Sequence, residues 1–135
     1  MKFENLKLGM CDSISKTITG KDVDSFAEIS LDTNPIHLNE EYASKTIFKK
    51  RIAHGILTTG LISAVLGTKL PGEGAIYLSQ DIKFLAPVYL NDTITATVKI
   101  IELNEEKRKV TVSTICTNQE GKEVLSGKAI LLQKF

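Results

Sequence analysis

The sequence predicts one α+β domain over residues 1–135, in which an antiparallel sheet curls around a buried helix. The segment 54–69 is apolar on nearly every side, which is typical of a helix enclosed by the rest of a domain. After Gly74 the chain reads as consecutive strands separated by short turns, with no second long helix. A length of 135 residues, without linker, repeat or low-complexity stretch, indicates a single domain.

Shorter elements precede the central helix. Residues 12–18 alternate in polarity and predict a strand. Thr19, followed three residues later by Asp22, forms a variant capping box that starts an amphipathic helix over about 20–30. Another short helix is expected over 39–45. The smaller helices therefore cluster in the first third of the chain.

The central helix is expected to pack closely against the sheet, because Gly60, Ala64 and Gly67 are small. Pro71 and the residues up to Gly74 favour turns and end this helix. The strands that follow are expected over 75–86, 93–103, 108–118 and 122–133. A sheet on so small a domain leaves open edges, so we expect a two-fold homodimer or a higher oligomer.

Charge and composition exclude several classes of partner. The net charge is +1, from 17 basic and 16 acidic residues that are well mixed, which argues against a nucleic-acid surface. No apolar run approaches the roughly 20 residues that span a bilayer, and no secretory signal is recognisable, so no membrane partner is expected. Cys11 and Cys116 are the only cysteines and lack metal-binding spacing, which favours free thiols in a reducing cytoplasm.

The segment Asp32-Thr33-Asn34-Pro35-Ile36-His37 places a carboxylate and an imidazole five positions apart across a bend. Pro35 fixes its own φ and favours an extended Asn34, whose side chain can bond to nearby backbone and hold the bend. Asp32 and His37 can therefore converge as an acid/base pair. An ordinary helix-to-loop turn, with Asp32 as a terminal residue and His37 facing solvent, is the alternative that the spacing leaves open.

Ala53-His54-Gly55 stands at the predicted start of the central helix. The first amides of a helix have no intrahelical partner and carry partial positive charge, so they can bind an anion or a polarised carbonyl oxygen. Gly55 has no side chain to block a ligand there. The alternatives are that Gly55 only packs tightly against the sheet and that His54 makes a structural hydrogen bond near the N-cap.

Ser63 and Leu66 lie further along the same helix, on the side that Gly55 occupies. A hydroxyl inside a core helix usually bonds the carbonyl one turn back, which is the plain reading of Ser63. No Gly-x-Ser-x-Gly motif is present, so a serine nucleophile is not expected. Cys11 and Cys116 have no activating context either.

At these residues the chain resembles the MaoC-like dehydratases, and among them the stand-alone (R)-specific enoyl-CoA hydratases. The resemblance covers nearly the whole chain. Its motifs are Asp32-x-Asn34-Pro35-x-His37, Ala53-His54-Gly55, Ser63, Leu70-Pro71-Gly72-x-Gly74, Ile76-Tyr77-Leu78 and Phe84-x-x-Pro87-Val88.

This resemblance implies a hot-dog fold, in which the sheet wraps the helix 54–69, and a dimer that holds acyl-CoA between its subunits. It also implies that Asp32 and His37 hold and activate a water molecule and that the Gly55 amide polarises the thioester carbonyl. Ser63, Leu66 and Asn34 are the candidate substrate-binding residues. The resemblance implies a supporting role for Ser63 in the pocket, and Leu66 is expected to line the acyl tail because it shares a side of the helix with Gly55.

The implied reaction is the reversible addition of water to trans-2-enoyl-CoA, giving (R)-3-hydroxyacyl-CoA. A short acyl chain is expected because 135 residues leave no second domain to lengthen the pocket. No metal or other cofactor is expected, since CoA is part of the substrate. The alternatives are a 3-hydroxyacyl-carrier-protein dehydratase, a hot-dog thioesterase and a non-enzymatic acyl-CoA-binding subunit.

Overall fold

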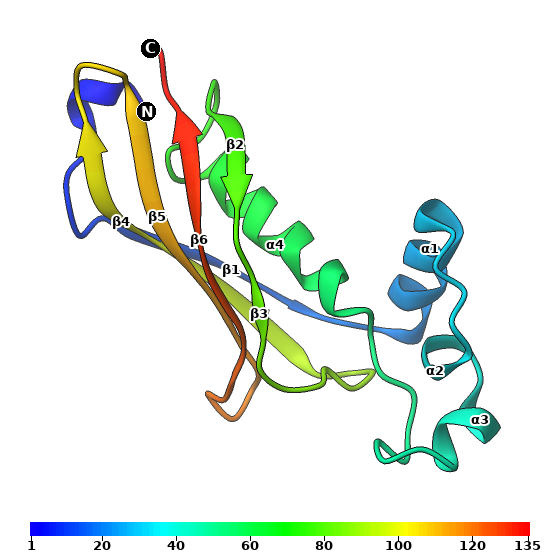
Figure 1. Cartoon of the computed structure of the whole chain (residues 1–135). Helices are drawn as coiled ribbons and strands as arrows, with labels where there is room; N and C mark the ends of the chain where they lie inside the picture. Colours follow the sequence, from blue (N-terminus) through cyan, green and yellow to red (C-terminus); the bar gives the residue numbers. More distant parts are fainter.

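A six-stranded antiparallel sheet bends around one long helix, and three short helices extend beyond it (Figure 1). The computed structural model describes residues 1–135 throughout. The strands lie in the order β1-β4-β5-β6-β2, and β3 also pairs with β6. The α+β prediction is confirmed. The bounds are Cys11–Thr17 for β1, Ile76–Gln80 for β2, Lys83–Phe84 for β3, Thr93–Asn104 for β4, Lys109–Thr117 for β5 and Glu123–Leu132 for β6.

The helices follow the sequence signals closely. A short 3₁₀ turn over Phe3–Asn5 is followed by α1 at Gly20–Ser30, α2 at Pro35–Leu38, α3 at Glu40–Ser44 and α4 at Gly55–Thr68. The capping box at the start of α1 is confirmed, since the Thr19 hydroxyl accepts from the Asp22 amide at 3.1 Å. The Asp22 carboxylate in turn accepts from the Thr19 amide at 3.0 Å. The bend after Asp32 contains one helical turn, α2, that the sequence reading did not expect.

One side of α4 is buried against the sheet and the opposite side is exposed. Ile62, Val65 and Leu66 pack into the core beneath β4 and β1. Each such side chain contributes about 1.5–3 kcal/mol by leaving water. The prediction that α4 is enclosed on every side is wrong for the single chain. Its exposed face carries Ile56, Gly60, Ser63 and Gly67, which are spaced as one helical stripe.

The strand expected over 75–86 is also interrupted. It divides into β2 and β3 because Asp81 turns its backbone toward β6, where its carboxylate accepts from the Lys128 amide at 3.0 Å. The Asp81 carbonyl approaches Gly127 so closely that a Cβ there would lie 1.9 Å from the oxygen. Gly127 therefore permits the chain between β2 and β3 to approach the β6 backbone closely at this break.

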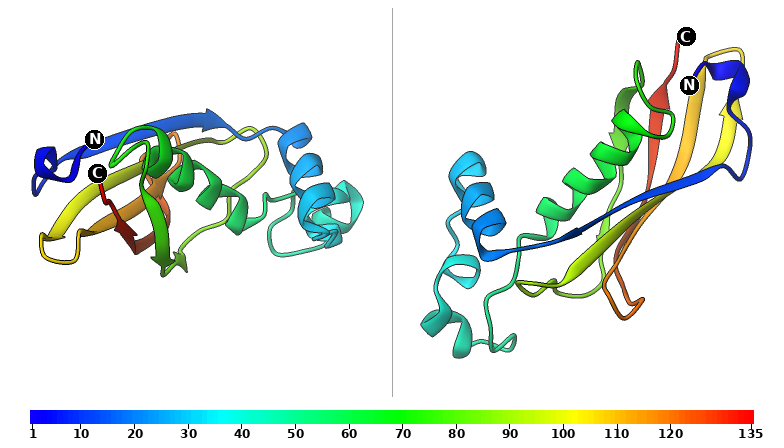
Figure 2. Two further views of the ribbon diagram at one scale, coloured as in Figure 1. Left: turned by 90° about the horizontal axis from the view of Figure 1, so that it is seen from above. Right: turned by 180° about the vertical axis from the view of Figure 1, so that it is seen from behind.

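The short helices α1, α2 and α3 reach beyond the sheet and lie beside the N-terminal end of α4 (Figure 2). The chain between α3 and α4 returns along this extension, and Ile52 forms an isolated antiparallel bridge with Tyr89. None of the helices combines the length and apolarity needed to cross a membrane. This arrangement brings the bend after Asp32 to the start of α4.

Candidate active site

The bend after Asp32 is ordered by its own side chains. The Asn34 side chain caps α2 by accepting a hydrogen bond from the Ile36 amide at 3.2 Å, and Pro35 is the first residue of that helix. The Asp32 carboxylate accepts from the Asn34 amide at 3.3 Å. These contacts make the segment a fixed turn, from which Asp32 and His37 project.

Four hydrogen bonds fasten this bend to the chain that leads into α4. The His37 ring donates from Nδ1 to the Ile52 carbonyl at 2.7 Å, and the His54 ring donates from Nε2 to the Asp32 carbonyl at 2.9 Å. The Arg51 Nε donates to the His37 carbonyl at 2.6 Å, and the Ile52 amide donates to Ile36 at 3.3 Å. Segments about twenty residues apart therefore form one rigid unit.

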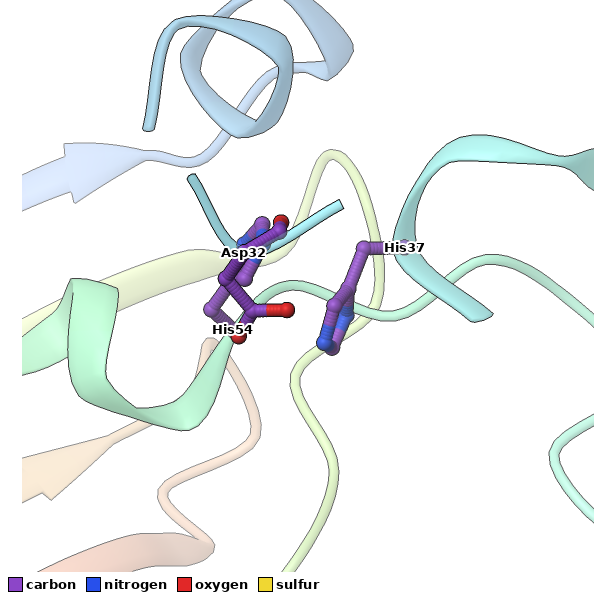
Figure 3. A group of neighbouring side chains, drawn as sticks. All are labelled: Asp32, His37 and His54. Atoms are coloured by element: carbon purple, nitrogen blue, oxygen red, sulfur yellow. The ribbon is translucent and has the colours of Figure 1, made fainter. Parts of the chain in front are cut away.

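Asp32, His37 and His54 come together at the centre of this unit (Figure 3). The two imidazole rings are stacked, with centroids 3.9 Å apart and planes inclined by 30°. One polar atom from each of the three side chains lies within 4.8 Å of the others. The predicted convergence of Asp32 and His37 is therefore present, and a solvent-facing His37 is excluded because that ring is largely buried.

A cavity of about 520 Å³ opens beside these groups. Its walls come from the bend, the start of α4 and the segment 84–88, and nine of its 15 lining residues are hydrophobic. Asp32, His37 and His54, whose polar atoms lie close together, are among the lining residues, and so is Gly55. The cavity therefore combines a few polar groups at one end with apolar walls that suit a hydrocarbon chain.

The start of α4 presents free amides at this cavity. The first backbone bond of the helix runs from the Leu57 amide to the His54 carbonyl at 3.0 Å, so the amides of Gly55 and Ile56 have no partner within the helix. A Cβ on Gly55 would lie 2.7 Å from the ring of Phe84, which is 57% exposed. Because glycine has no Cβ, the Phe84 ring can pack against position 55 while the amide of that residue stays free.

Burial lowers the pKa of the His37 imidazole from its ordinary value of 6.5. The adjacent His54 acts in the same direction, whereas the hydrogen bond to Ile52 and the nearby Asp32 oppose the shift. His37 is therefore neutral at pH 7, with Nδ1 engaged by Ile52 and Nε2 left as the available acceptor.

The three other candidate residues lie outside this cavity. Asn34 is exposed and is occupied in capping α2. Ser63 and Leu66 line a second hollow of about 100 Å³ together with Tyr77, roughly 12 Å further along α4. Leu66 is only 2% exposed and packs in the core. In the single chain these residues are therefore separated from Asp32 and His37, and their substrate-binding role stays a prediction.

Three further residues shape the site but were not among the sequence candidates: the side chain of His54, Arg51 and Phe84. A structural hydrogen bond of His54 near the N-cap was expected, and one exists. Its acceptor is the carbonyl oxygen of Asp32, and the side chain does not cap α4. Phe84 belongs to the motif Phe84-x-x-Pro87-Val88 and Arg51 to a basic run, but no local pattern shows their contacts with Gly55 and His37, which are distant in sequence.

The lowered pKa of His37 predicts a pH dependence that NMR can measure. The ring of His37 should titrate with a midpoint below 6.5, followed through its Cε1–H resonance. The unfolded chain then takes up this proton at a higher pH than the folded chain, so stability should fall as the pH drops through and below 6.5. A midpoint at or above 6.5 for His37 would contradict this description of the site.

Comparisons with known proteins agree with this geometry. The model of the MaoC like domain matches residues 8–122. An (R)-specific enoyl-CoA hydratase of Rhodospirillum rubrum is 54% identical over 96% of this chain and 90% of its own length. A 3-hydroxybutyryl-CoA dehydratase of Methylorubrum extorquens is 48% identical over 96% and 82%. The solved (R)-hydratase of Aeromonas caviae involved in PHA biosynthesis superposes with a TM-score of 0.93 at 37% identity, covering 96% of this chain and 98% of that one. The chain belongs to the MaoC-like family and has its hot-dog fold.

Proposed function

We propose that this protein is an (R)-specific enoyl-CoA hydratase, which adds water reversibly to a short-chain trans-2-enoyl-CoA. The observation that carries the proposal is the meeting of Asp32, His37 and the unpaired Gly55 amide at one end of an apolar cavity. The named activities of the two similar relatives support the same reaction class.

The acid/base chemistry is assigned to Asp32 and His37. A water molecule held between the Asp32 carboxylate and His37 Nε2 attacks C3 of the enoyl thioester. Asp32 accepts a proton from this water as the C3–O bond forms, and the same proton is delivered to C2 as the product is completed. A positioned acid/base group of this kind contributes roughly 10²–10⁴-fold to the rate.

The Gly55 amide is assigned to the thioester oxygen. When water adds to C3, negative charge moves to that oxygen as an enolate. A backbone donor fixed at a helix start stabilises this charge without reorganising, and one such donor is worth about 3–4 kcal/mol. Apolar residues, Phe84 among them, line the cavity beside this amide, and a low-polarity surrounding strengthens the interaction.

No metal ion is required for this chemistry. The polar atoms of Asp32, His37 and His54 are close enough to raise the question of a metal site. However, the lone pair of an imidazole nitrogen lies in its ring plane, and stacked planes direct two such lone pairs side by side instead of toward one point. Two of the ring nitrogens are also committed to main-chain carbonyls, so the arrangement does not favour a shared cation.

We further propose that the protein works as a homodimer in the cytoplasm. Exposed apolar side chains gather on the edge strand β2, on β3 and at the start of α4. They include Ile76, Leu78, Phe84, Leu85 and Ile56, which is 48% exposed. A second subunit on this surface would cover the open stripe of α4 and close the mouth of the cavity. The cytoplasmic location rests on the two unpaired cysteines.

The alternative substrates share the acyl thioester and differ in what carries it. A carrier protein would dock on basic residues at the entrance, for which Lys49, Lys50 and Arg51 are the candidates. Arg51 is occupied, because it pairs with Asp24 at 3.0 Å and donates to the His37 carbonyl. Lys49 and Lys50 remain to meet either CoA phosphates or an acidic protein, and the named activities of the two similar relatives support CoA.

The first test is hydration of crotonyl-CoA, followed as loss of enoyl-thioester absorbance. The wild-type protein should consume the substrate without releasing free thiol, which separates a hydratase from a thioesterase. Asp32→Asn should fold normally and lose at least about a hundredfold in kcat, because the amide cannot accept the proton. Near-native turnover in this variant would remove Asp32 from the role of base, and no turnover by wild type would contradict the function and favour a binding subunit.

The second test isolates the Gly55 amide with two variants at the same position. Gly55→Ala and Gly55→Pro both place a Cβ against the exposed Phe84 ring, but only proline removes the N–H. Proline is compatible with the first helical position. We expect kcat of Gly55→Pro to be about 10²–10³-fold below that of Gly55→Ala. Equal activities in the two variants would exclude the oxyanion contact.

The third test concerns the second subunit. Sedimentation equilibrium should give twice the chain mass for the wild type. Leu78→Asp, on the edge strand, should shift the protein toward monomer and lower its activity, because charge is introduced into an apolar contact. Ile101→Asp is the matched control, since Ile101 is similarly exposed but lies on the interior strand β4. A monomeric wild type with full activity would contradict the proposal.

A further inference from the structure

We propose that His54 is a positioning residue of the hydration reaction. Held as the Nε2–H tautomer, its ring fixes the main chain of Asp32 on one side and supports the ring of His37 on the other. The role in catalysis rests on the proposed function, whereas the tautomer can be tested without it.

The tautomer of His54 follows from its partner. The atom opposite Nε2, at 2.9 Å, is the carbonyl oxygen of Asp32, which can only accept a hydrogen bond. Nε2 therefore carries the proton. Nδ1 is buried and has no hydrogen-bond partner, and the residue is only 2% exposed. A proton on Nδ1 would be a buried donor without an acceptor, so this nitrogen carries a lone pair.

His37 is held in the opposite tautomer by the same logic. Its Nδ1 faces the carbonyl oxygen of Ile52 at 2.7 Å and must donate, which leaves the lone pair on Nε2. The His37 ring lies beside the Asp32 carboxylate at the cavity (Figure 3). His37 therefore accepts a hydrogen from the water that Asp32 deprotonates, and this function requires the tautomer that Ile52 selects.

The contacts of the His54 side chain are directed at the bend and not at its own helix. His54 is the N-cap residue of α4, yet its side chain makes no capping hydrogen bond. Its ring is enclosed between Phe26 of α1, at a centroid distance of 4.8 Å, and His37 of α2, at 3.9 Å. With the bond to Asp32, these contacts give the side chain control over both groups of the acid/base pair.

A readout independent of activity is the ¹⁵N spectrum of the imidazole rings. The chain has only two histidines, so His54→Phe assigns both sets of signals. At pH 7.5 we expect protonated Nε2 and unprotonated Nδ1 for His54, and the reverse for His37. Two rings in the same tautomer, or rapid exchange between tautomers at His54, would overturn the proposal.

Two matched substitutions separate the hydrogen bond from the stacking. His54→Phe keeps a flat ring between Phe26 and His37 but removes the donor to Asp32. His54→Gln loses the ring, but its side-chain amide can donate to the same carbonyl. We expect kcat with crotonyl-CoA to fall about 10–100-fold in His54→Phe, with KM changed less than about threefold. The loss in log kcat of His54→Gln should be at most half of the loss in log kcat of His54→Phe.

Binding of butyryl-CoA, a saturated analogue that cannot be hydrated, shows whether the sites remain folded. Calorimetric titration should give the same stoichiometry for His54→Phe and wild type. If the fraction of sites that bind butyryl-CoA falls by the same factor as kcat, the positioning role is overturned, because the substitution would then act by unfolding the site. Wild-type kcat in His54→Phe would overturn it as well.

A double substitution tests whether His54 acts through Asp32. In an Asp32→Asn background, adding His54→Phe should lower kcat by less than about threefold, since the base that His54 and His37 serve is already lost. The full multiplicative loss would overturn the proposal. If Asp32→Asn alone keeps its activity, the assignment of Asp32 as the base is wrong. The ¹⁵N spectrum then still tests the tautomer of His54.

Discussion

A reciprocal pair of hydrogen bonds between histidine rings and main-chain carbonyls is the constraint on which the site depends. The ring of His37 binds the carbonyl of Ile52, and the ring of His54 binds the carbonyl of Asp32. Each segment therefore supplies the acceptor that orients the histidine of the other. Because a carbonyl can only accept, the two bonds fix the segments together and also select which nitrogen of each ring carries the proton.

The fold contributes to the site by burying one side of α4 against the sheet and placing the first residues of that helix at the cavity. The sheet covers the apolar side of the helix, so its axis is fixed relative to the bend. The free amides of Gly55 and Ile56 then lie on a rigid element in the wall of a largely apolar cavity, where charge is poorly screened. Preorganised donors of this kind stabilise a transition state more than a flexible loop would.

Much of this arrangement could be predicted from local patterns. The continuous apolar character of 54–69 and the alternation of the later strands gave the fold class, and the capping residue Thr19 gave the start of α1. The spacing of Asp32 and His37 around Pro35 indicated that the two side chains can converge, and they do. Each of these features arises from residues close together in the chain, so the pattern can be recognised in a single sequence.

The remainder depends on contacts between distant residues. The break after Gln80 arises because Asp81 reaches Lys128 and requires Gly127, which no local pattern shows. The exposed side of α4 could not be predicted from its apolar sequence. An apolar helix side can be covered by the sheet of its own chain or by a second subunit, and the sequence pattern is the same in both cases. The alignment of Ser63 with Gly55 on the helix indicated one shared pocket, whereas the distance along α4 places Ser63 at a separate hollow in the single chain.

The most direct measurement is a crystal structure of the protein with butyryl-CoA, whose thioester is intact and whose acyl chain cannot react. The account predicts the thioester oxygen at about 3 Å from the Gly55 amide, and a water molecule bound to both the Asp32 carboxylate and His37 Nε2 on the side of C3. A thioester bound away from the start of α4, or a reacting carbon out of reach of that water, would contradict it.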